Sequence, residues 1–109
     1  MVKYIPKRGD LVWIDFSPQK GHEQAGKRPA FVLSPTLYNS KTGLMIALPI
    51  TSKEKGYPFE VKLDNLPING VVLCDQIKSL DYKARNIKFI YHCSDDIIEE
   101  ILAKVRVLI

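Results

Sequence analysis

The sequence predicts a small domain built mainly from β-strands and closed by one C-terminal helix. Short segments rich in β-branched and aromatic residues recur along the chain, and turns containing Pro, Gly or Asn separate them roughly every eight to twelve residues. Helical periodicity is clear only near the C-terminus. With 109 residues and 46% hydrophobic side chains, the chain is long enough for one core, so we expect a single domain over residues 1–109. This pattern is typical of a strongly bent antiparallel sheet or barrel.

The first two expected strands flank a long polar loop. Residues 10–16 are rich in strand-forming side chains and end at Ser17-Pro18. A second strand is expected over residues 28–35. Because proline cannot donate to a strand ladder, we expect Pro29 at the first position of this strand. The residue before a proline favours extended backbone, so Arg28 is expected to be fixed where the loop meets the strand.

The middle of the chain predicts further strands joined by short turns. Residues 36–43 form a polar connection with room for one helical turn. The unbroken apolar run over residues 44–50 is typical of a strand buried on both faces. Further strands are expected over residues 59–63 and 86–93, with a hairpin over residues 64–70 in which Asn69-Gly70 is a strong turn signal. The return strand of this hairpin is expected to start at residues 71–74, to be interrupted at Asp75-Gln76 and to continue over residues 77–81.

A helix is expected to begin after Ser94. The Ser94 hydroxyl can cap its first turn, and Asp95 and Asp96 suit the positive end of the helix dipole. Apolar side chains then recur at helical spacing and predict one stripe for core or dimer packing: Ile97, Ile98, Ile101, Leu102, Val105 and Leu108. The paired carboxylates at residues 95–96 and 99–100 are expected on a solvated face.

Several classes of site are disfavoured. Cys74 and Cys93 have no metal-binding spacing and are expected to be free thiols in a reducing cytoplasm. His92 adjoins Cys93, but adjacent strand residues point to opposite faces, which suits a metal site poorly. The N-terminus has no signal-peptide core and no apolar run could span a membrane. We therefore expect a cytoplasmic protein with no cofactor, no metal and no membrane contact.

Two polar loops remain as candidates for function, over residues 17–27 and 51–58. The net charge of +4 permits a polyanionic partner. If the loops meet, they form a basic cleft suited to single-stranded nucleic acid; otherwise they are two solvated loops. The first loop and its exit offer Lys20, His22, Glu23, Lys27 and Arg28, the second offers Thr51, Ser52, Lys53 and Lys55, and Phe16 and Tyr57 supply aromatic walls. Asn39 is a candidate for reading bases, with a simple turn role as the alternative.

The residues that carry these features resemble the MazF/PemK toxins of bacterial toxin–antitoxin systems. The resemblance runs from end to end of the chain. Its most specific part is the Glu-Gln-x-Gly-x-Arg-Pro pattern, and its main segments are residues 9–16, 21–29, 32–35, 55–61 and 75–79. It implies the small SH3-like barrel that these toxins share with the gyrase poison CcdB, and a homodimer. It also implies growth arrest by a metal-independent endoribonuclease that cuts single-stranded mRNA at a short sequence. The implied partner is a MazE-like antitoxin with an acidic, extended C-terminal tail, through which promoter DNA is bound only indirectly.

The resemblance also implies roles for particular residues. The catalytic arginine of the family falls on Arg28, its catalytic threonine on Thr51 and its loop glutamate on Glu23. Asp75 and Gln76 match positions that contact RNA. Lys27 stands where some relatives have histidine, which replaces a possible acid–base group with a phosphate contact.

This chemistry suits cleavage by the neighbouring 2′-OH, which gives a 2′,3′-cyclic phosphate and a 5′-OH. Such a reaction needs proton transfer and stabilisation of a phosphorane with extra negative charge. Arg28 can fork two donors onto phosphate oxygens and Thr51 can add a hydroxyl donor. Glu23 could act as the base or could orient Arg28. The alternatives from other classes are a CcdB-like toxin that binds and poisons DNA gyrase, and a small RNA- or peptide-binding barrel without toxicity.

Overall fold

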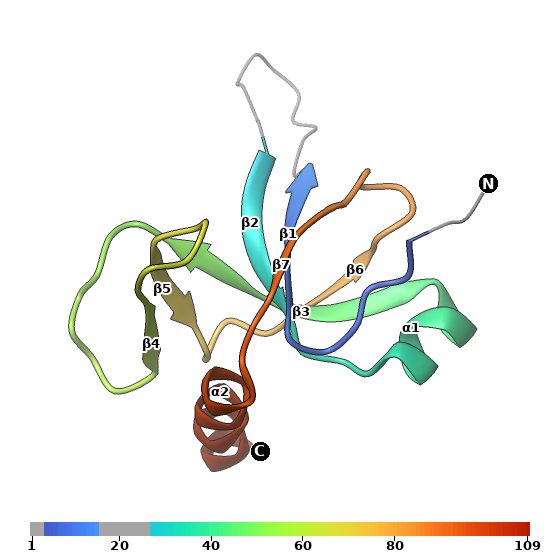
Figure 1. Ribbon diagram of the computed structural model, residues 1–109. Coiled ribbons are helices and arrows are strands. Elements are labelled where there is room, and N and C mark those ends of the chain that lie inside the picture. The colour runs from blue at the N-terminus through green and yellow to red at the C-terminus, as the bar shows by residue number, and fades with distance from the viewer. Residues whose placement is uncertain (1–3, 16–26) are drawn as a thin grey trace, which may run out of the picture.

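A bent antiparallel sheet with one long helix forms the structure, a computed structural model that describes residues 4–15 and 27–109. In these residues the sheet runs in the order β4-β5-β3-β2-β1-β7, and β6 pairs with β3 off this path (Figure 1). The elements are β1 (Asp10–Asp15), β2 (Lys27–Val32), α1 (Thr36–Thr42), β3 (Leu44–Thr51), β4 (Glu60–Leu63), β5 (Gly70–Leu73), β6 (Lys78–Asp81), β7 (Lys88–His92) and α2 (Asp95–Leu108). The predicted class, mainly β with a C-terminal helix, is confirmed.

The strand at the centre of the sheet is β3. Its first half pairs with β6, its middle with β2 and its last two residues with β5. Leu48 and Ile50 belong to the larger hydrophobic cluster, whereas Met45 and Ala47 belong to a second cluster. The prediction of a strand buried on both faces is therefore confirmed.

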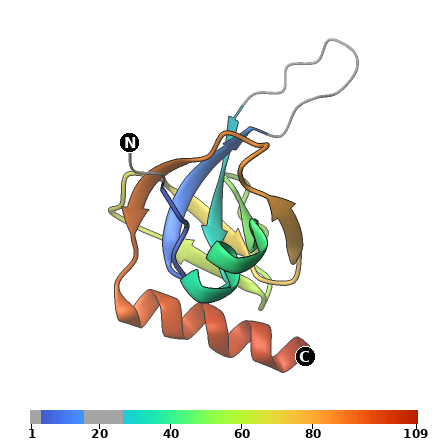
Figure 2. The same cartoon turned by 90° about the vertical axis from the view of Figure 1, so that its right-hand side faces the viewer.

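Helix α2 covers the larger cluster and lies across the end of the sheet opposite to the one where β1 finishes and β2 starts (Figure 2). Ser94 caps it as predicted, because its hydroxyl accepts a hydrogen bond from the backbone N–H of Ile97 at 3.5 Å. The predicted stripe packs into the core at Ile98, Ile101, Leu102 and Val105, and Ile97 is partly buried beside it. Leu108 is the exception, since it is 42% exposed near the helix end. Neither helix in the described part of the chain is long and apolar enough to cross a membrane.

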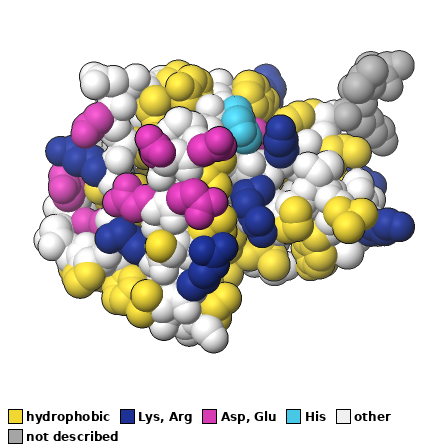
Figure 3. All heavy atoms as spheres, turned by 60° about the horizontal axis from the view of Figure 1, so that its bottom comes forward, with side chains coloured by type: hydrophobic (Ala, Val, Ile, Leu, Met, Phe, Trp, Pro, Cys, Tyr) yellow, Lys and Arg dark blue, Asp and Glu magenta, His cyan; other side chains and the backbone are white. Residues whose placement is uncertain are grey.

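The outward face of α2 is charged, as predicted. Its paired carboxylates at residues 95–96 and 99–100 are exposed. On the face that α2 contributes, acidic side chains are grouped together, with lysines and arginines beside them (Figure 3). A polyanion would meet carboxylates there, so this face does not suit RNA binding.

Two local predictions are wrong. Pro29 is the third residue of β2, not the first; it pairs with Trp13 of β1, and pairing with β3 begins only at Ala30. The lost N–H is tolerated where β2 extends beyond its pairing with β3. Asn69-Gly70 is not a tight turn, because Gly70 already belongs to β5 and pairs with Leu63.

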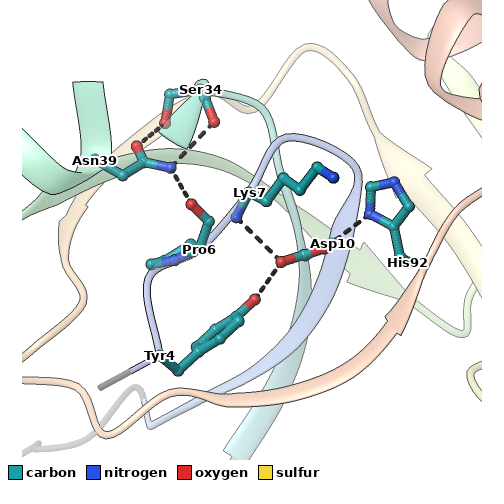
Figure 4. Close-up of polar contacts among 7 residues, drawn as sticks. All are labelled: Tyr4, Pro6, Lys7, Asp10, Ser34, Asn39 and His92. Atoms are coloured by element: carbon teal, nitrogen blue, oxygen red, sulfur yellow. Dashed lines mark hydrogen bonds and ion pairs between the residues drawn. The ribbon is translucent and has the colours of Figure 1, made fainter. Parts of the chain in front are cut away.

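A buried carboxylate anchors the segment that precedes β1. Asp10 accepts hydrogen bonds from the hydroxyl of Tyr4 and from the backbone N–H of Lys7 at 3.0 Å, and it contacts Nδ1 of His92 at 2.8 Å (Figure 4). Burial and the bond to Asp10 raise the pKa of the Tyr4 phenol. These contacts tie the start of the described chain to the end of β7.

Asn39 is a second buried anchor, and the prediction that it contacts RNA is wrong. Its side chain has no exposed surface. Its Nδ2 donates to the carbonyls of Pro6 (2.8 Å) and Ser34 (3.1 Å), and its Oδ1 accepts from the Ser34 hydroxyl at 2.5 Å (Figure 4). The Tyr82 hydroxyl donates to its backbone carbonyl at 2.9 Å. The Asn39 side chain therefore joins the N-terminal segment to the connection between β2 and α1.

We expect Asn39→Ala to lower the free energy of unfolding by about 2–4 kcal/mol, because it leaves buried carbonyl and hydroxyl groups without partners. Urea denaturation measures the change. Ser40→Ala on the same helix is the matched control: its hydroxyl is exposed, and its loss should cost less than about 0.5 kcal/mol. Equal stability of the two variants would contradict the assigned role.

Candidate active site

The register between β2 and β3 directs Arg28 toward Thr51 when it is continued beyond the residues that pair. Ala30 pairs with Pro49, and Val32 with Ala47. Two residues beyond the last pair, the same register sets Arg28 against Thr51. Because strand side chains alternate between faces, both lie on the face of Ala30 and Ala47. Sequence analysis placed Arg28 where the first loop meets the second strand and Thr51 at the start of the second loop, whereas the structure places both on neighbouring strands, β2 and β3.

The backbone of Arg28 is held by the pairing of β2 with β1, on the side of β2 away from β3. It pairs with Ile14 of β1, and its side chain is exposed. Its position within β2 confirms the expectation of extended backbone where the loop meets the strand. A guanidinium on a fixed backbone can direct its fork of N–H donors at a phosphate at a small entropic cost.

Thr51 ends β3 with its hydroxyl oriented by the backbone. Its Oγ1 accepts a hydrogen bond from the N–H of Lys53 at 3.2 Å, which leaves the hydroxyl hydrogen to donate elsewhere. Its main chain is closely packed, because Thr51 pairs with Val71 of β5 and lies against Gly70. Gly70 has φ +138, and a Cβ there would come within 2.4 Å of the Thr51 carbonyl oxygen. Only glycine allows this approach, so Gly70 serves the packing of β5 against Thr51 and not a turn.

The connection after Thr51 leads to a second group of predicted residues. It arches alongside β4 (Figure 1). The Tyr57 hydroxyl donates to Oδ2 of Asp75 at 2.7 Å, and this hydrogen bond is the main cause of a raised Tyr57 pKa. The Tyr57 ring meets Phe59 edge to face, with centroids 6.5 Å apart. Tyr57 and Asp75, predicted separately as substrate contacts, are therefore one unit.

The Arg28–Thr51 group and the Tyr57–Asp75 group lie at opposite ends of the β4–β5 strand pair. Thr51 lies beside Gly70, whereas Asp75 follows the end of β5 at Leu73. Three residues of strand separate the ends, which is about 10 Å at 3.3 Å per residue. We use the term track for the two ends of this strand pair together, with Arg28 and Thr51 at one end and Tyr57 and Asp75 at the other.

Comparison with known proteins identifies the family. The model of the PemK-like, MazF-like toxins of type II toxin–antitoxin systems matches residues 7–109. This chain belongs to that family. The endoribonuclease toxin MazF of Escherichia coli K12 is 49% identical over 107 residues, which cover 98% of this chain and 96% of the relative. The endoribonuclease PemK of Escherichia coli is 33% identical over 108 residues, covering 94% and 81%.

Solved structures agree with this assignment. A crystal structure of MazE–MazF from Deinococcus radiodurans matches with a TM-score of 0.92 and 50% identity, covering 97% of this chain and 96% of that one. The predicted toxin barrel is therefore confirmed. The relatives are named endoribonucleases, so the comparisons favour RNA cleavage over the gyrase-poison alternative.

The remaining predicted residues are placed as follows. Lys27, Lys53, Lys55 and Gln76 are exposed at or near the track. Phe16, Lys20, His22 and Glu23 lie outside the described residues.

Sequence analysis missed two residues that hold the second loop. The Glu60 carboxylate accepts hydrogen bonds from the backbone of Lys55 and Gly56, and the Lys104 ammonium donates to the Pro58 carbonyl at 2.7 Å. Sequence analysis gave neither Glu60 nor Lys104 a role in this loop. The only signal for Glu60 in the sequence is its position as a carboxylate shortly after a glycine-containing loop, and Lys104 has no such signal.

The cysteines take no part in this site. Both are free and buried, as predicted. Burial raises the pKa of the Cys74 and Cys93 thiols to about 11, so both stay protonated and weakly nucleophilic at neutral pH. Among residues 4–15 and 27–109, no cluster of three His, Cys, Asp or Glu side chains could hold a metal ion.

We expect Gly70→Ala to reduce RNA cleavage about tenfold or more, because the new Cβ must push the Thr51 carbonyl and with it the end of β3. Gly43→Ala is the matched control. Its φ is also positive, at +76, but a Cβ there would meet only the Lys83 side chain at 3.8 Å. Both variants should lose about 1–3 kcal/mol of stability, but only Gly70→Ala should lose activity per folded molecule. Equal cleavage rates for the two would contradict the role given to Gly70.

Proposed function

We propose that this chain cleaves single-stranded mRNA at a short sequence, without a metal ion, by attack of a ribose 2′-OH on the adjacent phosphate. The chain is an endoribonuclease toxin of a type II toxin–antitoxin system, as its relatives are. The observation that supports the finer mechanism is the register that sets Arg28 opposite Thr51 at an exposed strand end. The cytoplasm, where mRNA is translated, is the expected place of action.

Each residue has a distinct part in the proposed reaction. The Arg28 guanidinium forks onto the non-bridging oxygens and offsets the charge that builds up in the phosphorane. The Thr51 hydroxyl donates a further hydrogen bond, since its oxygen already accepts from Lys53 N–H. Arginine is a poor base because its guanidinium stays protonated in proteins and has no acceptor for a hydrogen bond. Glu23 is proposed either to take the 2′-OH proton or to orient Arg28.

The track leading away from Thr51 suits the rest of the RNA. Lys27, Lys53 and Lys55 are exposed cations for phosphates. The Tyr57 ring is partly exposed for base stacking, and Asp75 and Gln76 are exposed to accept from base edges. We propose Phe16, Lys20 and His22 as further contacts from the first loop.

The proposed partners follow from the family. Several matching crystal structures from Deinococcus radiodurans contain both MazE and MazF, and we propose that a MazE-like antitoxin with an acidic extended tail neutralises this chain. Promoter DNA would be bound only through that complex. We also propose a homodimer, but not one that forms through the 44–50 strand or the apolar stripe of α2. The 44–50 strand and most of the helical stripe are buried within the protomer. The exposed apolar residues at the end of α2 are Val107, Leu108 and Ile109.

We expect Arg28→Ala and Thr51→Ala each to lower the cleavage rate by about 10²–10³, because each removes a donor that stabilises developing charge. The assay incubates purified protein with a long, weakly structured RNA in EDTA and maps the 5′ ends. Wild-type protein should give discrete cuts with 5′-OH ends.

Conservative variants serve as controls for the assignment. Thr51→Ser keeps the hydroxyl and should retain most activity. Arg28→Lys keeps the positive charge but loses the forked pair of donors, so its cleavage rate should lie between those of wild type and Arg28→Ala. Near-normal turnover by either alanine variant, with unchanged urea unfolding, would overturn the assignment.

A further inference from the structure

We infer that Glu60 is a positioning residue that sets the substrate end of the track through the backbone of the 52–59 loop. This inference rests on the proposed function and deepens it. Glu60 begins β4, and its side chain lies under the loop on the outer side of the strand. It reaches Tyr57 and Asp75 indirectly, through main-chain amides.

The contacts of Glu60 are those of a carboxylate that organises a turn. Its Oε1 accepts from the N–H of Gly56 at 2.9 Å and of Lys55 at 3.2 Å, and its Oε2 lies 3.1 Å from the same Lys55 nitrogen. Its own N–H donates to the Tyr57 carbonyl at 3.2 Å. Gly56 has φ +80, which lets two successive amides converge on one carboxylate. The turn that carries Tyr57 is closed by these bonds.

The local charge argues against a passive surface role. Glu60 stands beside a loop that carries Lys53 and Lys55, the cations proposed to bind phosphate. An uncommitted carboxylate there would repel the RNA backbone. The Glu60 carboxylate instead accepts hydrogen bonds from two backbone amides of the loop. Such charge-assisted bonds are stronger than those between neutral groups.

The turn connects to the substrate residues. Tyr57 follows Gly56 directly, and its hydroxyl holds Oδ2 of Asp75 at 2.7 Å. A tyrosine has few side-chain torsions, so fixing its backbone fixes the ring and the hydroxyl. The bond to Tyr57 then orients Asp75, whose second oxygen is left for a base edge. Thr51 lies at the other end of the track, because it pairs with Val71 near the start of β5, whereas Asp75 follows the end of β5. Loss of Glu60 should therefore weaken substrate binding and leave the chemical step intact.

The test compares Glu60→Ala with Glu54→Ala in steady-state cleavage of a short RNA that carries one mapped wild-type cut site. Glu54 is the matched control because it lies on the same loop, carries the same charge and makes only an exposed ion pair with Lys62 at 3.6 Å. We expect Glu60→Ala to raise KM about tenfold with kcat within twofold, a pattern that indicates lost binding. Glu60→Gln keeps one acceptor oxygen and should raise KM less. Glu54→Ala should stay within twofold of wild type in both constants.

A double-mutant cycle with Tyr57→Phe tests the route. If Glu60 acts through Tyr57 and Asp75, the double variant should be no worse than the worse single variant. If the KM increases of Glu60→Ala and Tyr57→Phe multiply in the double variant, the route through Tyr57 is overturned. A fall in kcat that follows the loss of folded protein in urea unfolding would show a merely structural role and also overturn the inference. So would wild-type KM for Glu60→Ala. Failure of the wild-type protein to cut RNA would instead overturn the proposed function, so the two failures are distinguishable.

Discussion

The two-sided burial of β3 is the constraint on which the rest of the structure depends. Leu48 and Ile50 fill one hydrophobic cluster, and Met45 and Ala47 fill the other. A shift of one residue in the pairing would exchange these faces and move every side chain into the wrong cluster, so the register cannot slip. The position of Thr51 is therefore fixed by the apolar residues that precede it. Because β2 pairs with the middle of the same strand, the position of Arg28 follows from the same register.

The structure fixes its functional parts by two different means. The strand ends carrying Arg28 and Thr51 are held by ladders and by close backbone packing at Gly70. The 52–59 loop has no such ladder, and charged side chains hold its backbone from outside: Glu60 holds two amides and Lys104 one carbonyl. Helix α2, which carries Lys104, is itself fixed by Ile101 and Val105 in the larger cluster. The helix thus stabilises the core and supports the substrate loop at once.

Much of the fold follows from local patterns in the sequence. The unbroken apolar run of β3, the alternation in β4 and the capped stripe of α2 each report burial directly, so strands and helix were predicted close to their observed places. The errors occur where a residue serves a distant partner. Asn39 has the composition of a turn or base-reading residue, but its amide is used by Pro6, more than thirty positions away. Gly70 has the signature of a turn, but its freedom serves the approach to Thr51. Arg28 and Thr51 were named from resemblance, and only the strand register places them opposite each other.

Charge placement explains why the substrate track and α2 differ although both carry acidic residues. On α2 the exposed carboxylates lie in the first half of the helix, and its two cations, Lys104 and Arg106, follow toward the C-terminal end, so the surface has no sustained positive field (Figure 3). Along the track the carboxylates are already engaged by donors from the protein: Glu60 by backbone amides and Asp75 by the Tyr57 hydroxyl. Each engaged carboxylate repels phosphate less and is held in one orientation. In the proposed function, the exposed lysines bind the RNA backbone and the held Asp75 oxygen discriminates between bases. A modest net charge of +4 is compatible with this proposal, because hydrogen bonds within the protein already engage Glu60 and Asp75.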